Sequence, residues 1–368
     1  MKHLILIITL SISFCCCRDR MGDNKSRTEF YVGTYTGSGS QGIYKYLMYD
    51  DGTLERVGLA VKTENPSYLA FNENRKFLLA VNENSPEGTI ESYRMEGDSL
   101  IRISRSETGG AHPCFVAINE HAYVLTANYT SGTIGLLKLG SNGKLSELLD
   151  IEQHTGSGTT DRQQGPHAHS AWFEPGTSRV ISADLGTNEL WFSDLDTVQE
   201  KLCPENPQRL RMDPGAGPRH MAFHPDGKWI YVINELNSTV TLVKENANGE
   251  YEKGTSFKCL PADYNSPNYC ADIGITSDGR FVYASNRGHN SIAIFKTDED
   301  NGILESVGHQ ITCGDWPRNF KLSPDENYLL VANQNSNNIV SFKRDITTGY
   351  IEPVDTIKAP SPVCILFR

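Results

Sequence analysis

Two histidines lie one residue apart in the stretch GPHAHSAWFEP, which covers residues 165–175. In an extended strand, the side chains of His167 and His169 would point to the same face, because alternate residues do so. This geometry suits two ligands of a metal ion, a catalytic base with a helper, or two polar residues in a turn. A metal site would need a third protein ligand in the same place. The choice therefore depends on the elements that position the two histidines.

The stretch that contains the two histidines is one copy of a repeat. Phrases of the same design start near Asn65, His112, Gly165, Gly217, Tyr269 and Trp316. Most copies carry a proline directly before the first strand, and the copies recur about every 50 residues, which lies within the range of propeller-type repeats.

Each copy predicts four short strands. An alternating apolar strand follows the proline, a turn such as HPDGK or SPDEN ends it, and two more β-rich strands and a less regular fourth follow. Alternation with a period of two between Gly, Asn, Asp and Pro is typical of strands, and no segment has a helical period. Four strands per repeat correspond to one blade of a propeller.

The two ends of the chain complete the count of blades. FYVGTYTGSGSQGIYKYL near the start matches the second and third strands of a copy, and SPVCILFR at the C-terminus matches a first strand. We therefore predict an all-β fold, a single seven-bladed β-propeller over residues 28–368. Its ring would be closed by the C-terminal strand joining the N-terminal blade, which removes free sheet edges.

In a propeller, the first strand of each blade starts on the face of the ring where the second strand ends. Aligning the copies therefore places variable polar residues from both positions at one mouth of the central channel. At the start of the first strand the polar members include His169, Arg219 and Arg318, and the next position includes His220 and Asn319. The column after the second strand holds Tyr35, Glu83, Tyr129, Leu185, Glu235, Arg287 and Gln334. A scaffold would repeat one residue in each column, so variation at polar positions indicates a site.

Three arginines around one glutamate indicate a pocket for an anion. Arg219, Arg287 and Arg318 would surround Glu235 and leave cationic charge unpaired, and guanidinium groups bind phosphate or carboxylate in bidentate fashion. The same charges would repel a divalent cation, so we predict no metal and no cofactor. The six cysteines after residue 17 lack CxxC spacing and predict neither a zinc site nor a redox pair. The alternative is that the charges pair with one another and line a wet channel.

Several phrases make the chain similar to a known family. They are GPHAHS, GPRHMAFHPDG, YVINELNS, SNRGHNSIAIF and YLLVANQNSNNI. From residue 28 onward the chain resembles the seven-bladed lactonase family, which is typified by the propeller type of 6-phosphogluconolactonase and includes the fungal carboxymuconate cyclase. The resemblance implies metal-independent hydrolysis of a sugar lactone, 6-phosphoglucono-1,5-lactone to 6-phosphogluconate. The catalytic residues that it implies are His169 (or His167), Arg219, Glu235 and Arg287.

Opening a lactone requires a base for the attacking water and donors for the developing oxyanion. We expect Glu235 or His169 to act as the base, and Arg219 and Arg287 to stabilise the oxyanion. A distal phosphate or carboxylate of the small-molecule substrate would be held by Arg318, Asn319 and Gln334. The second-rank candidates for substrate binding are His167 and His220.

The N-terminus predicts export. Lys2 precedes an apolar stretch over residues 4–14, and three cysteines follow at positions 15–17. Such a stretch is too short to span a membrane and is typical of a signal peptide. We predict a signal peptide of lipoprotein type over residues 1–17, a linker over 18–27, and a protein that is periplasmic or attached to the outer membrane by a lipid anchor. The alternative is an apolar N-terminal strand in a cytoplasmic protein.

Export raises a question about the substrate, because 6-phosphogluconolactone is an intracellular metabolite. An exported lactonase would act on an unphosphorylated sugar lactone or on another lactone. The alternatives are a non-catalytic surface propeller that binds a glycan or a protein, and an enzyme that works in the cyclase direction. A net charge of −11 at pH 7 excludes nucleic acid as a partner, because its backbone requires a basic surface.

Overall fold

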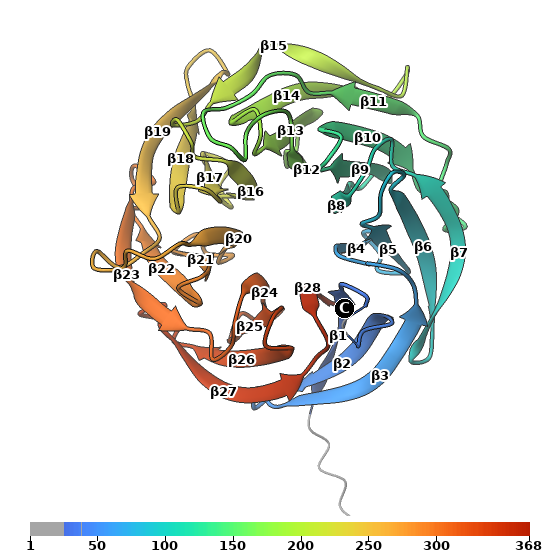
Figure 1. Cartoon of the computed structure of the whole chain (residues 1–368), viewed down its shortest axis with the longest axis vertical. Coiled ribbons are helices and arrows are strands. Elements are labelled where there is room, and N and C mark those ends of the chain that lie inside the picture. The colour runs from blue at the N-terminus through green and yellow to red at the C-terminus, as the bar shows by residue number, and fades with distance from the viewer. Residues whose placement is uncertain (1–25, 38) are drawn as a thin grey trace, which may run out of the picture.

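The computed structural model of the chain describes residues 26–37 and 39–368. These residues form seven four-stranded antiparallel sheets around a central axis, and no helix occurs among them (Figure 1). The predicted all-β, seven-bladed propeller is therefore confirmed.

Six blades are each built from four consecutive strands, and the first strand of each lies nearest the axis (Figure 1). The second blade consists of β4 (Leu69–Phe71), β5 (Phe77–Asn82), β6 (Thr89–Glu96) and β7 (Ser99–Glu107). The third consists of β8 (Pro113–Ile118), β9 (Tyr123–Asn128), β10 (Thr133–Lys138) and β11 (Asp150–Gln153). The fourth consists of β12 (Ala168–Phe173), β13 (Arg179–Asp184), β14 (Glu189–Asp196) and β15 (Lys201–Arg211).

The remaining consecutive blades follow the same order. The fifth consists of β16 (Pro218–Phe223), β17 (Trp229–Asn234), β18 (Thr239–Glu245) and β19 (Tyr251–Lys258). The sixth consists of β20 (Tyr269–Ile275), β21 (Phe281–Arg287), β22 (Ser291–Thr297) and β23 (Leu304–Ile311). The seventh consists of β24 (Pro317–Leu322), β25 (Tyr328–Asn333), β26 (Asn338–Arg344) and β27 (Ile351–Lys358).

The first blade combines the two ends of the chain and closes the ring. Its members are β28 (Pro362–Phe367), β1 (Arg27–Thr34), β2 (Gly42–Tyr49) and β3 (Leu54–Lys62), in that order from the axis outward. The antiparallel register places Val32 opposite Ile365. The predicted closure by the C-terminal strand is therefore confirmed, and it removes the free edge that β1 would otherwise present.

The apolar core lies between neighbouring sheets. All six residues of β17 are buried, because adjacent blades cover both faces of the sheet. Tyr231 and Ile233 of β17 pack in one cluster with Val282 and Ala284 of β21. Truncating a side chain such as that of Ile233 would cost about 2–5 kcal/mol through lost burial and the cavity left behind. This packing makes the inner strands a rigid frame for the residues at the axis.

A β-bulge recurs where the innermost strand of a blade begins. In β16, Pro218 lies opposite Asn234 and His220 lies opposite Ile233, so Arg219 has no partner in the ladder. The equivalent extra residues in three other blades are Cys114, His169 and Arg318. A bulge bends a strand and re-aims one side chain. The column predicted at the start of the first strand thus coincides with the bulged residues.

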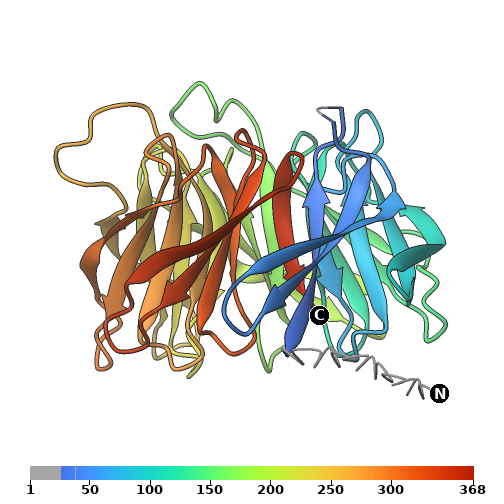
Figure 2. The same cartoon turned by 90° about the horizontal axis from the view of Figure 1, so that it is seen from below.

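The predicted signal peptide (1–17), its cysteines and most of the predicted linker (18–27) lie outside the described residues. The first strand, β1, begins at Arg27. No helix in the described part of the chain is long and apolar enough to cross a membrane. Two long loops, residues 154–167 in green and 259–268 in orange, project from the same face of the ring (Figure 2).

Candidate active site

A cavity of about 320 Å³ lies at the axis, where the first strands begin and the second strands end. Its lining residues are Tyr35, Glu83, Cys114, Tyr129, Arg162, His169, Glu235, Tyr269, Arg287, Trp316, Arg318 and Gln334. The structure thus brings five of the predicted site residues together in one cavity: His169, Glu235, Arg287, Arg318 and Gln334.

Glu235 follows β17 directly and holds three guanidinium groups. Its Oε2 lies 2.7 Å from Nη2 of Arg287 and 3.1 Å from Nε of Arg219, and its Oε1 lies 3.3 Å from Nη2 of Arg162. Burial alone would raise the pKa of this carboxyl, but Arg287, Arg219 and Arg162 outweigh burial and lower the pKa of Glu235 to about 2. Glu235 is therefore ionised and has both oxygens occupied.

Arg219 lies behind Glu235 and does not line the cavity. Its side chain is buried, and Nη1 donates a hydrogen bond of 2.5 Å to the carbonyl of Ala271 and lies 3.4 Å from Nε2 of His220. Burial, Arg287 and Arg318 lower the pKa of Arg219 to about 10, so the group stays charged at neutral pH. In this position Arg219 contacts Glu235 from outside the cavity lining.

His169 is the bulged residue of β12 and reaches the cavity wall. Its Nδ1 lies 3.7 Å from Sγ of Cys114, and its ring packs edge-on against Tyr129 with centroids 5.6 Å apart. Burial, followed by the charge of Arg219, lowers the pKa of His169 well below 6.5. The imidazole is therefore neutral at pH 7 and retains a lone pair for a proton.

His167 lies next to the strand that carries His169 and not in it. His167 precedes β12, its ring stacks on Tyr129 at 4.6 Å, and its Nδ1 lies 3.0 Å from the carbonyl of Tyr129. His167 thus does not line the cavity that His169 reaches. Within residues 26–37 and 39–368, no three His, Cys, Asp or Glu side chains come together in a way that could hold a metal ion.

His220 and Asn319, which we predicted to bind substrate, lie outside the cavity lining. Both bind the carboxylate of Asp272: Nδ1 of His220 lies 2.9 Å from Oδ1, and Nδ2 of Asn319 donates to Oδ2 at 2.5 Å. Burial and Arg219 lower the pKa of His220 to about 4, so its ring is neutral. The three residues form a buried polar layer that supports Arg219 from behind.

Arg318 differs from the other arginines in the cavity. Its Nη2 donates a hydrogen bond of 2.7 Å to the hydroxyl of Tyr35, which donates one of 2.8 Å to Oε2 of Glu83. In the described part of the chain, Arg318 has no carboxylate within ion-pair distance. Gln334 lines the cavity as well, and its Oε1 accepts no hydrogen bond from the described residues. This part of the cavity therefore holds a guanidinium that reaches a carboxylate only through the hydroxyl of Tyr35.

Arg162 lines the cavity but was not predicted from the sequence. Its side chain is half-exposed on the loop 154–167, and its Nη2 donates to the hydroxyl of Tyr129 at 2.8 Å as well as to Glu235. In the fourth blade, the residue directly after the second strand is the buried, apolar Leu185. The polar group on that side of the cavity comes instead from Arg162. Arg162 lies outside the repeated strands, so no column could contain it. Tyr35 and Glu83 were in a column but had no assigned role.

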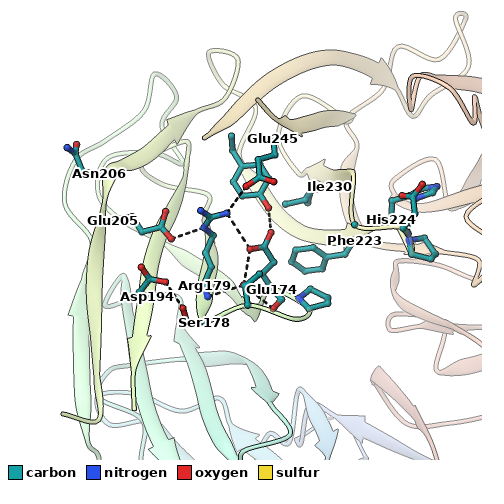
Figure 3. A pocket seen from close by; sticks show the side chains of 16 residues that line it. Glu174, Ser178, Arg179, Asp194, Glu205, Asn206, Phe223, His224, Ile230 and Glu245 are labelled. Carbon is teal, nitrogen blue, oxygen red and sulfur yellow. Dashed lines mark hydrogen bonds and ion pairs between the residues drawn. The ribbon is translucent and has the colours of Figure 1, made fainter. Parts of the chain in front are cut away.

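A larger cavity, of about 870 Å³, lies between the fourth and fifth blades (Figure 3). Turns that join first to second strands line it, so it opens on the other face of the ring. Arg179 points toward three carboxylates there, with Nε 2.7 Å from Glu205 and Nη1 3.4 Å from Glu174 and from Glu245 (Figure 3). These carboxylates satisfy Arg179, and none of the bulged residues lines this cavity, so the axial cavity is the candidate active site.

Comparison with known families decides the identity. Residues 29–367 match a family described as Lactonase, 7-bladed beta-propeller. The chain belongs to the seven-bladed β-propeller lactonases. The resemblance seen in its phrases is thereby confirmed, and as a member of this family the chain is a lactone hydrolase.

Relatives of this lactonase include enzymes named for sugar lactones. It is 36% identical to the 6-phosphogluconolactonase of Bacillus subtilis over 343 residues, which covers 92% of this chain and 97% of that protein. It is 35% identical to the 6-phosphogluconolactonase of Formosa agariphila over 280 residues, which covers 72% and 77% respectively. The structure of the periplasmic gluconolactonase of Pseudomonas aeruginosa superposes with a TM-score of 0.89 at 29% identity, covering 93% of this chain and 99% of that one.

Proposed function

We propose that this lactonase hydrolyses a sugar lactone by metal-independent attack of water in the axial cavity, with 6-phosphoglucono-1,5-lactone as the first candidate. The observation that carries the proposal is the presence, in one cavity, of a neutral imidazole at His169 and a guanidinium at Arg318 that makes no direct ion pair with a described carboxylate. The relatives named 6-phosphogluconolactonase and gluconolactonase support a sugar lactone, with or without phosphate.

His169 is the better base of the two candidates. The carboxylate of Glu235 has a pKa of about 2 and accepts from three arginines, so it has little affinity for a proton. The ring of His169 is neutral, and no described residue occupies its Nε2. A neutral imidazole within reach of water is the side chain that most often acts as a general base. We assign proton removal from the attacking water to His169.

Arg287 is the group that stabilises the oxyanion. Its guanidinium lines the cavity and is held by the carbonyls of Tyr269 and Cys270, at 3.1 and 3.0 Å, and by Glu235 at 2.7 Å. A cation fixed in this way needs no reorganisation when negative charge develops on the carbonyl oxygen of the lactone. Arg318 and Gln334 hold the distal anionic group at another part of the wall.

A rate assay tests this proposal. Purified protein is assayed in a pH-stat with glucono-1,5-lactone and with its 6-phosphate. We expect hydrolysis above the spontaneous rate, and we expect Arg318→Met to raise KM for the 6-phosphate by about tenfold or more, because a charge-assisted contact is lost. Spontaneous rates only, on both lactones, would contradict the proposal and favour a propeller that binds a glycan or a protein without catalysis.

We also propose that the protein is exported and carries a lipid anchor on one of its N-terminal cysteines. The support is the order of Lys2, the apolar stretch and Cys15–Cys17. Expression of the full chain and of a variant with all three cysteines changed to serine, followed by cell fractionation, tests this. The full chain should sediment with membranes and the variant should not. Recovery of both proteins in the same soluble fraction would contradict the anchor.

A further inference from the structure

A chain of two hydrogen bonds connects a carboxylate to Arg318, the arginine of the cavity that makes no direct ion pair with a described residue. Nη2 of Arg318 donates to the hydroxyl of Tyr35 at 2.7 Å, and this hydroxyl donates to Oε2 of Glu83 at 2.8 Å. All three side chains line the axial cavity. We propose that Glu83, acting through Tyr35, tunes which group the enzyme accepts at the distal end of its lactone, and that it lowers the preference for a phosphate dianion relative to a hydroxyl. This inference rests on the proposed lactonase function.

The three residues come from blades that meet where the ring closes. Tyr35 follows β1 in the first blade, and its backbone N–H donates to the carbonyl of Ser361 beside β28 at 3.2 Å. Glu83 follows β5 in the second blade, where its N–H donates to the carbonyl of Asn65 at 3.0 Å. Arg318 is the bulged residue of β24 in the seventh blade. Backbone hydrogen bonds therefore fix the main chain of Tyr35 and Glu83 at the ends of their strands, and the bulge fixes that of Arg318.

The direction of the hydrogen bonds is fixed by the tyrosine. Burial, which outweighs the opposing charge of Arg318, raises the pKa of Tyr35 well above 10, so the hydroxyl keeps its proton. It accepts from Arg318 and donates to Glu83, and Glu83 makes no ion pair with any described residue. The guanidinium of Arg318 also lies over the ring of Tyr35, 5.2 Å from its centroid. The carboxylate of Glu83 therefore lies within the cavity, joined to Arg318 through Tyr35 and not in direct contact with it.

The carboxylate of Glu83 has opposite effects on two kinds of lactone. A hydroxyl at the distal end of a sugar lactone can donate to the free oxygen of Glu83 while it accepts from Arg318. A phosphate dianion gains the attraction of Arg318 but meets the repulsion of Glu83, and like charges in apposition oppose binding strongly. Glu235, the other carboxylate of the lining, is paired with three arginines and does not discriminate in this way.

The test compares kcat/KM for 6-phosphoglucono-1,5-lactone with kcat/KM for the unphosphorylated lactone. Glu83→Gln keeps the size and a hydrogen-bond acceptor but removes the charge, so we expect the ratio of the two values to rise about tenfold, mainly through KM for the phosphorylated lactone. Glu64→Gln is the matched control. Glu64 is exposed near the same rim, contacts Asn84 and does not line the cavity, so the ratio should not change.

An unchanged ratio in Glu83→Gln, with both lactones still hydrolysed, would overturn this inference and leave the proposed function intact. A wild-type protein that hydrolyses neither lactone would instead contradict the proposed function. In that case calorimetric titration with inorganic phosphate tests the inference by itself. Tighter phosphate binding by Glu83→Gln than by wild type would support a role for Glu83, and equal affinities would overturn it.

Discussion

At the scale of single residues, the cavity is organised around one carboxylate. Glu235 binds Arg287, Arg219 and Arg162 within 3.3 Å and is nearly buried. Without that charge, buried guanidinium groups would face one another. This explains why the pKa of Glu235 lies near 2 despite burial. It also explains why a residue at the centre of the site is better suited to hold cations than to accept a proton.

Removing the charge of Glu235 should destabilise the fold as well as the activity. We expect Glu235→Gln to lower the free energy of unfolding by about 3–5 kcal/mol, the usual cost of breaking a buried ion pair on one side. Urea unfolding at pH 7 measures this. Glu245→Gln, which removes a half-exposed partner of Arg179, should cost less than about 1 kcal/mol. Equal losses in the two variants would contradict the central place of Glu235.

The pH dependence of stability provides a second test of Glu235. Its pKa in the folded state is about 2, below its ordinary value of 4.5. Its stabilising effect is therefore complete above pH 4.5 and is lost as the pH falls toward 2. In urea titrations over this interval, the wild-type unfolding free energy should fall more steeply with decreasing pH than that of Glu235→Gln. Parallel curves would show that Glu235 is not the group that titrates.

At the scale of elements, a bulge and a loop complete the site. Every copy of the repeat starts its first strand at the same position. Alignment of the copies therefore predicted that His169 and Arg318 lie at the axis, and both line the cavity. It also placed Arg219 and His220 in the site, yet neither lines the cavity. Whether such a residue points into the cavity or into the layer behind it depends on the bulge and on side-chain packing. Neither can be predicted from the order of residues along a repeat.

The loop 154–167 positions Arg162 through its neighbour Gln163. The side chain of Gln163 is buried, its Nε2 donates to the carbonyl of Leu185 at 2.8 Å, and its Oε1 accepts from the backbone N–H of Thr159 at 3.1 Å. Because this loop lies between blades, the repeat could not predict its role. Its contact with Glu235 shows that an insertion outside the repeated strands contributes to the cavity.

Releasing Gln163 should weaken substrate binding without affecting the chemical step. We expect Gln163→Ala to raise KM about fivefold with little change in kcat. A fivefold rise corresponds to a loop that keeps its binding arrangement in only about a fifth of the molecules. Steady-state kinetics on the preferred lactone measure this. Gln164→Ala is the control, because Gln164 is exposed. A KM equal to that of wild type in Gln163→Ala would show that the loop does not position the site.

At the scale of the whole molecule, closure of the ring joins residues that are far apart in the sequence. Tyr35, Glu83 and Arg318 meet in one cavity only because β28 and β1 lie in one sheet. The seven-blade count was predictable, because each end of the chain supplies the strands that the other lacks. The distances across the axis were not predictable, because they depend on how all seven sheets pack against one another.

Opening the ring should remove both stability and activity. A chain that ends at residue 361 lacks β28 and exposes the edge of β1. We expect it to aggregate or to lose cooperative thermal unfolding, as measured by circular dichroism, because an unpaired edge and an uncovered core face remain. Deleting Arg368 alone removes exposed contacts with Glu29 and should cost less than about 1 kcal/mol. Cooperative unfolding of the shorter chain at the wild-type temperature would contradict closure by β28.

The pH profile of kcat/KM for lactone hydrolysis, in wild type and in His169→Gln, tests the central claim most directly. Burial lowers the pKa of His169 well below 6.5, so the neutral base persists and the wild-type profile should stay level from pH 8 to below pH 6.5, then fall in more acidic solution. In His169→Gln, kcat should fall by about 10²–10⁴ and the acid limb should disappear. A wild-type kcat in His169→Gln, or an acid limb with a pKa above 6.5, would contradict the assignment of the base.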